Sequence, residues 1–280
     1  MIDLSVLKKI YVEEKQQAVD AILTLYTQQK YAIINYLYFA QLMHQRLLEW
    51  TPEAIQSKYY HALLQGDFLF ADGIALQLFH RWLVDRIHTP PNLNGTDFCP
   101  VLLRAIIQEY GADNIHLSIF NVRDEYIGKS ESYVERIKEY MHETYGCQVN
   151  FTRQCHYRER QIATPRKTYE AALVWNKKPI RVLLNFIGAP YQEVMVAEQQ
   201  SFVQTHQILV LNQWGTIDFW MGVEKRAPVR VVKARVFETP RRILSNPQKN
   251  LRKFMWMFGV IRVGRKLLVQ SFFSPWSLWK

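Results

Sequence analysis

The chain has 280 residues, 49% of them hydrophobic, which is enough to bury a sizeable core and excludes a disordered protein. Its three cysteines form no Cys-x-x-Cys pair, so neither a disulfide framework nor a zinc site is expected. The longest apolar run, residues 254–261, is too short for a transmembrane helix, and the first residues lack the apolar run of a secretory signal. We therefore expect a cytoplasmic protein that does not span a bilayer.

The net charge of +10 is concentrated at one end of the chain. Residues 225–280 contain fourteen Lys and Arg residues against one acid, Glu238, so this stretch carries +13 and the first 224 residues carry −3. A cationic stretch after a nearly neutral body predicts an anionic partner: a membrane surface, a phosphorylated lipid or nucleic acid. No nucleic-acid-binding motif accompanies the charge, so nucleic acid is the least favoured of the three.

Apolar runs separated by helical patterns predict alternating strands and helices. After an N-terminal stretch with helical spacing, the expected strands are residues 31–37, 67–71, 115–120, 148–152, 180–187 and 207–211. Helices are expected at 51–64, 96–111 and 132–146, and from about residue 191; Ser132 and Glu135 have the spacing of a capping box. This pattern predicts an α/β protein with a mostly parallel, Rossmann-like sheet covered by helices over residues 1–224, followed by a basic helical appendage over residues 225–280.

Three short motifs follow expected strands, and parallel sheets bind ligands at the carboxyl ends of their strands. The motifs are Ala-Asp-Gly at 71–73, Gly-Ala-Pro-Tyr-Gln-Glu at 188–193, and Gly-Thr-Ile-Asp-Phe at 215–219, which leads to Arg-Ala-Pro at 226–228. Asn-Gly-Thr-Asp at 94–97 lies between the first two. In this order and spacing, over roughly residues 30–255, they resemble the WecG/TagA/CpsF family of inverting glycosyltransferases.

A carboxylate at a strand end can take the proton from an acceptor hydroxyl while the hydroxyl oxygen attacks an anomeric carbon. Asp72 lies at such a position, and the resemblance implies that it is the general base. The alternative interpretation is that Asp72 and Gly73 form only a turn, because both residue types are favoured in turns.

Other residues of these motifs are expected to contact the substrates. Gln192 and Glu193 open a helix after a strand, where a side-chain amide and the helix N-terminus can hold sugar hydroxyls or phosphate, and the resemblance implies a ligand contact for Gln192. Glu193 and Asp97 could instead be acids that stabilise a first helical turn. The full set expected here is Asn35, Gly73, Asp97, Gly188, Gln192, Glu193, Gly215 and Asp218.

No Asp-x-Asp pair occurs to hold a divalent ion on a donor diphosphate, so we expect no metal ion and no other cofactor. Cationic side chains must then stabilise the leaving diphosphate. The candidates are Arg226, Arg241, Arg242, Lys249, Arg252 and Lys253. The resemblance implies that Arg242, Lys249 and Lys253 close over the diphosphate; each could instead belong to a solvated basic face.

The chain departs from the family pattern near the expected nucleotide site. Ile33 replaces a threonine, Asn92 replaces an arginine, and three residues replace glycines, namely Asn121, Asn212 and Trp214. Such changes could lower the affinity for the donor or alter its identity, and Trp214 adds a bulky ring where close backbone approach is expected. A diverged family member without activity is therefore an open alternative.

Beyond Gln248 the chain mixes cationic residues with Phe, Met, Trp and Leu, a composition typical of a segment at a membrane surface. Its apolar residues could instead pack on the main domain or on a second subunit. The expected function is transfer of a hexose or N-acetylhexosaminyl-type sugar from a UDP-sugar to a polyprenyl-diphosphate-linked saccharide, in surface polysaccharide synthesis at the inner face of the cytoplasmic membrane. The alternative is a diverged, non-catalytic family member that acts as a membrane-surface scaffold or partner subunit. Assembly into a homo-oligomer is left open for either function.

Overall fold

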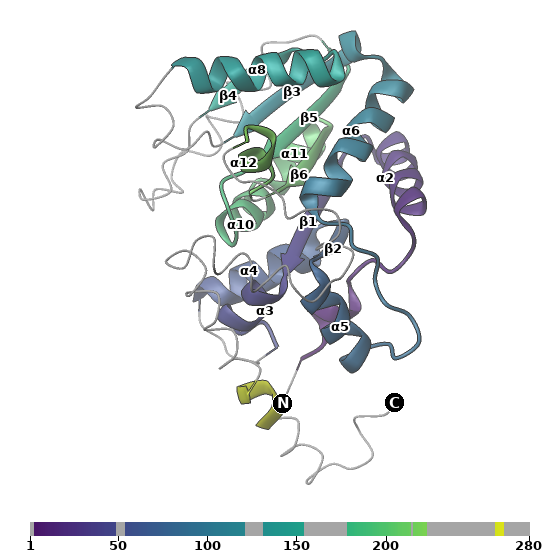
Figure 1. Cartoon of the computed structure of the whole chain (residues 1–280), viewed down its shortest axis with the longest axis vertical. Helices are drawn as coiled ribbons and strands as arrows, with labels where there is room; N and C mark the ends of the chain where they lie inside the picture. Colours follow the sequence, from purple (N-terminus) through teal and green to yellow (C-terminus); the bar gives the residue numbers. More distant parts are fainter. Residues whose placement is uncertain are drawn as a thin grey trace.

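A single six-stranded sheet organises the computed structural model, which describes residues 3–48, 54–120, 131–153, 178–213, 215–222 and 261–265. The strand order is β2-β1-β6-β5-β3-β4, and every pair is parallel (Figure 1). The strands are β1 (Ala32–Tyr38), β2 (Phe68–Asp72), β3 (Ile115–Phe120), β4 (Val149–Arg153), β5 (Ile180–Asn185) and β6 (Ile208–Asn212). The predicted α/β class and parallel sheet are confirmed.

Near-continuous apolar sequence explains why these strands form the centre of the molecule. All residues of β3 and β6 are buried, as are all of β1 except Tyr38. Strands that are buried on both faces need apolar residues at successive positions, as parallel sheets do. Each predicted strand is found within one or two residues of its expected bounds.

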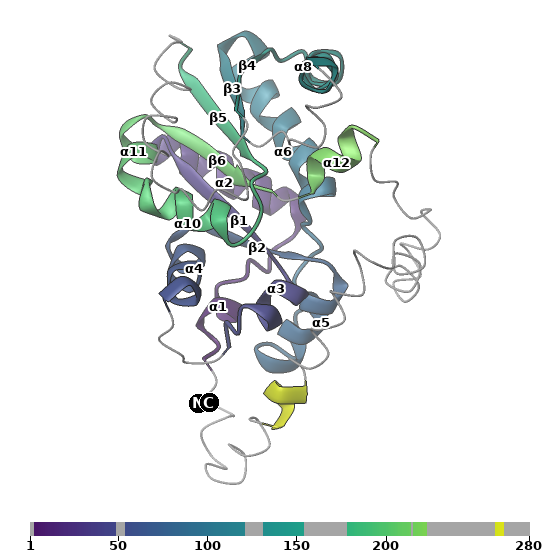
Figure 2. The ribbon, with the colours of Figure 1, turned by 90° about the vertical axis from the view of Figure 1, so that its left-hand side faces the viewer.

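Helices cover both faces of the sheet (Figure 1, Figure 2). One face is covered by α2 (Lys15–Gln29), α6 (Gly95–Tyr110) and α8 (Glu131–Tyr145), and the other by α4 (Ala54–Gln65), α10 (Tyr191–Glu198) and α11 (Gln200–Thr205). The remaining elements lie in the connections: α1 (Ser5–Lys8), α3 (Phe39–His44), α5 (Ile74–Leu83), α12 (Thr216–Trp220) and a 3₁₀ turn (Ala112–Asn114).

Three details differ from the sequence-based expectations. The helix expected from residue 191 is divided into α10 and α11, because Gln199 (φ −110°, ψ 20°) leaves helical geometry. Helix α8 already includes Glu131, so Ser132 lies inside its first turn and the capping box is wrong; Glu135 pairs with Lys138 instead. Helices α2, α3, α5 and α12 were not expected; α3 and α12 are too short for a helical pattern to stand out, whereas α5 is an amphipathic helix that the sequence analysis missed.

The described C-terminal segment, residues 261–265, is helical and packs on the α3 and α5 end of the molecule (Figure 1, Figure 2). Val263 is buried in an apolar cluster that includes Leu42, Leu76 and Ala71, and Arg262 Nη2 donates to the Met43 carbonyl at 3.4 Å. The expected boundary at residue 225 lies outside the described residues. Among the described helices, none has the length and apolar character needed to cross a bilayer.

Candidate active site at the carboxyl edge of the sheet

The carboxyl ends of β1 and β6 lead to opposite faces of the sheet. Strand β1 continues into α3 and α4 on one side, whereas β6 leads to α12, whose Ile217 and Met221 join the core beneath α6. A parallel sheet forms a ligand-binding crevice where neighbouring strands diverge in this way. The three motifs from the sequence all lie at this edge: Asp72 ends β2, residues 188–193 follow β5, and residues 215–219 follow β6.

Asp72 is the last residue of β2, where it pairs in register with Tyr38, and its side chain is partly exposed. Gly73 follows with φ +90°, a backbone conformation that side-chain-bearing residues rarely adopt, and it begins α5. Burial raises the pKa of the Tyr36 phenol well above its usual value, and the negative charge of Asp72 acts in the same direction. The carboxylate of Asp72 is therefore within electrostatic reach of the buried phenol of Tyr36.

Three buried asparagines form a hydrogen-bonded row across the central strands. Asn212 on β6 donates through Nδ2 to Asn35 Oδ1 on β1 at 2.8 Å, and Asn185 Nδ2 on β5 donates to Asn212 Oδ1 at 3.0 Å. Asn35 in turn donates to the Ala62 carbonyl of α4 at 3.2 Å. All three side chains are at most 1% exposed. The row, which we call the asparagine row, links the last residues of β5 and β6 to the middle of β1, and it engages both polar groups of Asn35 with protein atoms.

The asparagine row includes one of the departures from the family pattern. Asn212 stands where a glycine is usual, and here its carboxamide bridges Asn35 and Asn185. Ile33, another departure, is a buried core residue of β1, and Asn92 is exposed before α6. Asn121 and Trp214 lie outside the described residues. The Asn212 substitution therefore has a structural role at the strand ends.

Gln192 and Glu193, at the start of α10, are both 1% exposed. The Gly188 N–H donates to Gln192 Oε1 at 3.0 Å, and Gln192 Nε2 donates to Glu193 Oε1 at 2.7 Å. The amide of Gln192 thus holds the loop after β5 against the helix that follows it. A ligand contact through the remaining N–H of Gln192 stays a prediction.

Burial strongly affects the carboxyl group of Glu193. It raises the pKa of this group to about 8, so the carboxyl is protonated at neutral pH. Within the described part of the chain, Glu193 Oε2 and the hydroxyl of Tyr59 on α4 are buried without hydrogen-bond partners. Burial also raises the pKa of the Tyr59 phenol, and a charge on Glu193 would raise it further, so the two groups lie near each other.

The N-terminus of α6 lies against that of α12. A Cβ atom added to Gly95 would lie 2.8 Å from Thr216 Oγ1, so only glycine permits this approach. Asn94 caps α6 by accepting the Asp97 N–H at 2.9 Å, and its Nδ2 donates to the Asp97 carboxylate at 2.8 Å. The structure therefore supports the interpretation of Asp97 as an acid in the first turn of α6. A contact between Asp97 and a substrate stays a prediction.

The third motif begins α12. Gly215 has φ +82° at the start of this helix, and Asp218 is buried in its first turn, where its N–H donates to the Gly215 carbonyl at 3.2 Å. The predicted cations Arg226, Arg241, Arg242, Lys249, Arg252 and Lys253 lie outside the described residues. The structure thus gathers the predicted residues of the first 224 positions at one edge of the sheet.

Sequence reasoning missed several residues of this edge. Asn185 joins the asparagine row, Gln213 donates to the Tyr36 hydroxyl at 3.3 Å, and Tyr59 is within electrostatic reach of Glu193. A signal for the first was present, since β1, β5 and β6 each carry two aliphatic residues followed by asparagine. An asparagine after the same aliphatic pair in three apolar strands suggests that the three asparagines lie side by side on neighbouring strands, as they do here.

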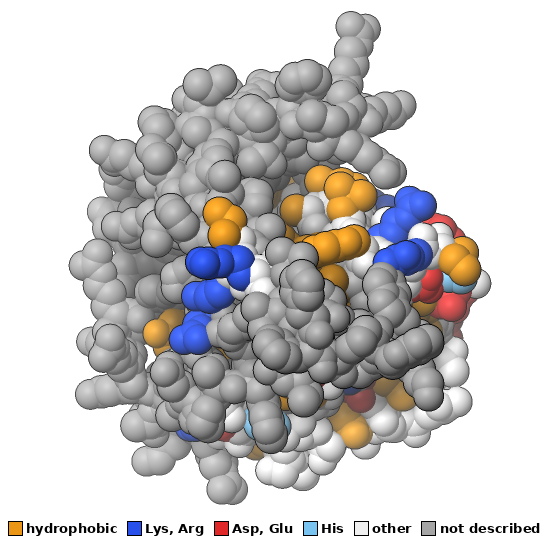
Figure 3. All heavy atoms as spheres, turned by 90° about the horizontal axis from the view of Figure 1, so that it is seen from below, with side chains coloured by type: hydrophobic (Ala, Val, Ile, Leu, Met, Phe, Trp, Pro, Cys, Tyr) orange, Lys and Arg blue, Asp and Glu red, His pale blue; other side chains and the backbone are white. Residues whose placement is uncertain are grey.

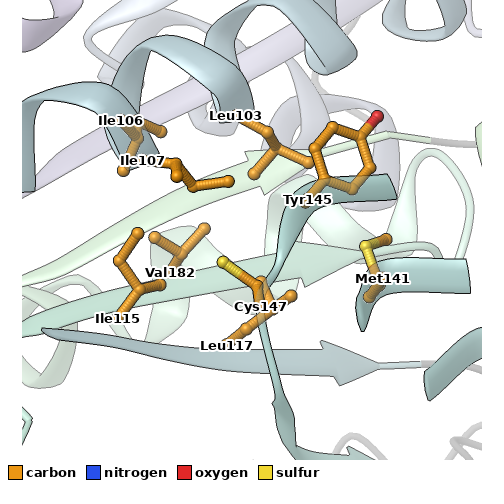
Figure 4. A pocket seen from close by; sticks show the side chains of 9 residues that line it. All are labelled: Leu103, Ile106, Ile107, Ile115, Leu117, Met141, Tyr145, Cys147 and Val182. Atoms are coloured by element: carbon orange, nitrogen blue, oxygen red, sulfur yellow. The ribbon is translucent and has the colours of Figure 1, made fainter. Parts of the chain in front are cut away.

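A small apolar cavity of about 10 Å³ lies away from this edge, between α6, α8 and the first halves of β3 and β5 (Figure 4). Its lining is apolar apart from the Tyr145 hydroxyl and the Cys147 thiol, and burial raises the pKa of that thiol. The cavity has room for roughly one water molecule, which makes it a packing defect rather than a substrate site.

The fold and the edge define an α/β protein with a Rossmann-like parallel sheet and an acidic residue, Asp72, at the carboxyl edge of that sheet. The sequence model of the glycosyl transferase WecG/TagA/CpsF family matches residues 7–274 of this chain, so the protein belongs to that glycosyltransferase family. The comparison with curated proteins found no match.

Proposed function

We propose that the protein transfers a hexose or N-acetylhexosaminyl-type sugar, with inversion and without a metal ion, from a UDP-sugar to a polyprenyl-diphosphate-linked saccharide in surface polysaccharide synthesis. Family membership supports the reaction class. The observation that carries the proposal is the position of Asp72, a partly exposed carboxylate at the end of β2 beside the crevice.

In the proposed reaction, Asp72 accepts the proton of the acceptor hydroxyl while the hydroxyl oxygen forms a bond to the anomeric carbon. The bond between that carbon and the donor diphosphate breaks, and UDP leaves with the electron pair. Arg242, Lys249 and Lys253, with Arg226, stabilise the charge that develops on the diphosphate. Two of these are lysines, which keep the charge but lack the bidentate fork of arginine.

The described C-terminal segment supports a role of the basic stretch at this edge. Val263 packs in the apolar cluster that contains Ala71, the neighbour of Asp72. The described segment that follows the cationic residues is thus attached to the cluster beneath the end of β2, and we propose that those cationic residues close over the diphosphate. We propose that the same stretch attracts an anionic membrane surface, which holds the protein at the inner face of the cytoplasmic membrane.

Replacing Asp72 by Asn tests the proposed base. We expect transfer to fall by roughly 10²-fold to 10⁴-fold, the usual contribution of a general base, while UDP binding measured by calorimetry persists. Asp113→Asn is the matched control, because Asp113 is an exposed acid near the opposite edge of the sheet. Full turnover in Asp72→Asn would remove Asp72 from the mechanism.

Asn212 favours a second candidate, a family member that acts as a membrane-surface scaffold or partner subunit without turnover. Its buried carboxamide fills space that a glycine would leave open at the carboxyl edge. Calorimetric titration with UDP separates the two candidates, because a scaffold should release no heat and an enzyme should bind the nucleotide.

A further inference from the structure

Helix α5 begins directly after Asp72 and Gly73 and carries an unusual exposed face. Leu78 and Trp82 are 55% and 54% exposed, and their spacing of four residues puts them on the same side of the helix. Ile87, in the loop that follows, is 81% exposed. Of the five large hydrophobic side chains that are exposed in the described part of the chain, these three and Ile261 lie at this end; the fifth, Val12, precedes α2.

The loop after α5 is held in a defined conformation. Asp85 Oδ1 accepts the backbone N–H groups of Ile87 and His88 at 2.9 and 3.1 Å, and Asp85 Oδ2 contacts His88 Nδ1 at 2.8 Å. These bonds present Ile87 to solvent at the tip of the loop. Its exposure therefore belongs to an ordered structure, in which an apolar side chain points away from the core.

Cationic side chains surround these apolar residues. Arg81 and Arg86 are exposed on α5 and its loop, and Arg265 is exposed on the segment 261–265. The one acidic residue in residues 74–93 and 261–265 is Asp85, which is already engaged by the loop. Figure 3, viewed from this end, shows hydrophobic side chains with Lys and Arg side chains on either side of them, and Asp and Glu side chains beside the cations at the right.

We propose that this α5 surface, made of Leu78, Arg81, Trp82, Arg86 and Ile87 with Ile261 and Arg265, docks the protein onto an anionic lipid bilayer. The inference deepens the proposed function and rests on it for the acceptor. Tryptophan with aliphatic side chains inserts at the boundary between headgroups and acyl chains, while arginines attract anionic headgroups. A second copy of the chain fits less well, because a two-fold contact would bring arginines against arginines.

The position of the α5 surface suits a lipid-linked acceptor. Helix α5 has ten residues and is therefore about 15 Å long, with Asp72 before its first turn and Trp82 in its last. If the protein docks through Leu78, Trp82 and Ile87, the distance from Asp72 to the membrane surface is about the length of α5, ~15 Å. An acceptor hydroxyl on a saccharide that protrudes from the bilayer could reach the carboxylate there without leaving its lipid.

The test is flotation of the full-length protein with vesicles of phosphatidylethanolamine and phosphatidylglycerol. We expect the triple variant Leu78→Ser, Trp82→Ser, Ile87→Ser to lower the partition coefficient at least tenfold, and Arg81→Gln to lower it less. Matched controls are Val12→Ser, an exposed apolar residue outside the α5 surface, and Lys138→Gln, an exposed cation on α8. Wild-type partition of the triple variant would overturn the proposal, as would an oligomer that dissociates in this variant while vesicle binding persists.

Trp82 packs on Phe79 with ring centroids 5.7 Å apart, so a second measurement avoids disturbing it. Ile87→Cys in a Cys155→Ser background, labelled with a polarity-sensitive fluorophore, should show a blue shift on adding vesicles, and labelled Val12→Cys should not. No shift at Ile87 while the protein floats would exclude the α5 surface. Transfer to a water-soluble acceptor tests the proposed function separately: its absence would overturn that function and leave the vesicle result standing.

Discussion

Glu193 is a carboxylic acid that the fold keeps protonated. Because burial raises its pKa to about 8 in the folded protein, whereas an unfolded glutamate titrates near 4.3, the folded state holds a proton that the unfolded state loses between these values. The stabilisation is therefore complete below pH ~4 and is lost as the pH rises toward 8. The folded and unfolded states differ by at most one bound proton at this group. The unfolding free energy therefore falls by at most ~1.4 kcal/mol per pH unit.

Replacing Glu193 by Gln removes this titration and puts a neutral amide of similar shape in place of the protonated carboxyl group. We expect urea unfolding at pH 5 to 8 to show a shallower fall of stability in Glu193→Gln than in the wild type. Glu198→Gln is the control, since Glu198 lies on the same helix but forms a partly exposed ion pair with Lys58 at 2.7 Å. Equal pH slopes for wild type and Glu193→Gln would contradict the raised pKa.

Single residues of the candidate site were predictable where a motif named them. Asp72, Gly188 and Gly215 could be placed at strand ends, and the structure has them there. What could not be predicted is how side chains from distant motifs meet. The effect of a charge on Glu193 of α10 on the pKa of Tyr59 of α4, for example, depends on how two helices pack over the same face of the sheet.

At the scale of elements, the turn between α4 and β2 is closed by Gly66, which lies over the asparagine row. A Cβ atom at Gly66 would collide with Asn35 Nδ2, and Asn35 is held between Asn212 and the Ala62 carbonyl. We therefore expect Gly66→Ala to lower the unfolding free energy by ~1–3 kcal/mol, the cost of overpacking a buried site, measured by chemical denaturation.

Gly264→Ala is the matched control for this substitution. Gly264 is in the helical segment 261–265, its φ is not positive, and an added Cβ would meet no atom within 4 Å. Its stability should change by less than about 0.5 kcal/mol or increase slightly, because alanine favours helix over glycine. If Gly66→Ala and Gly264→Ala had equal unfolding free energies, a Cβ atom at position 66 would not disturb Asn35 and the asparagine row, and the prediction would be wrong.

Strands were easier to predict than helices in this chain. The six buried strands appear as apolar runs with near-correct bounds, because burial on both faces demands such runs. Helix α12 has only five residues, too few for a periodic pattern, and depends on tertiary packing. Helix α5 does carry an amphipathic pattern, which the sequence analysis missed. The break between α10 and α11 is a backbone detail of Gln199 that no periodic pattern marks.

At the scale of the whole molecule, the C-terminal segment is attached to the core through Val263, which is 3% exposed. Replacing Val263 by Ala removes two buried methyl groups from the cluster that holds α3 and α5, and should cost ~1–3 kcal/mol of stability, measured as a lower midpoint of thermal unfolding. Ile261→Ala, a change at a 57% exposed position of the same segment, should have little effect. Equal midpoints in both variants would show that the segment does not stabilise the core.

The class of fold followed from the alternation of strands and helices, but the order of the strands did not. β1 lies between β2 and β6, and β6 is formed by residues more than 170 positions later in the chain. Such a pairing is selected by the packing of the whole sheet and leaves no local pattern. The convergence of the motifs at one edge followed from the parallel arrangement once all strands were known to point the same way.

All hydrogen bonds of the asparagine row run in the same donor-to-acceptor direction. Each nitrogen donates toward α4 and each oxygen faces the β5 side, from the Ile187 N–H, which Asn185 Oδ1 accepts at 3.4 Å, to the Ala62 carbonyl. Turning any single carboxamide over would bring like atoms together at its neighbours, so the three must keep a common orientation. The dipoles beneath this edge are consequently aligned by folding itself, and a polar ligand arriving there would find them already set.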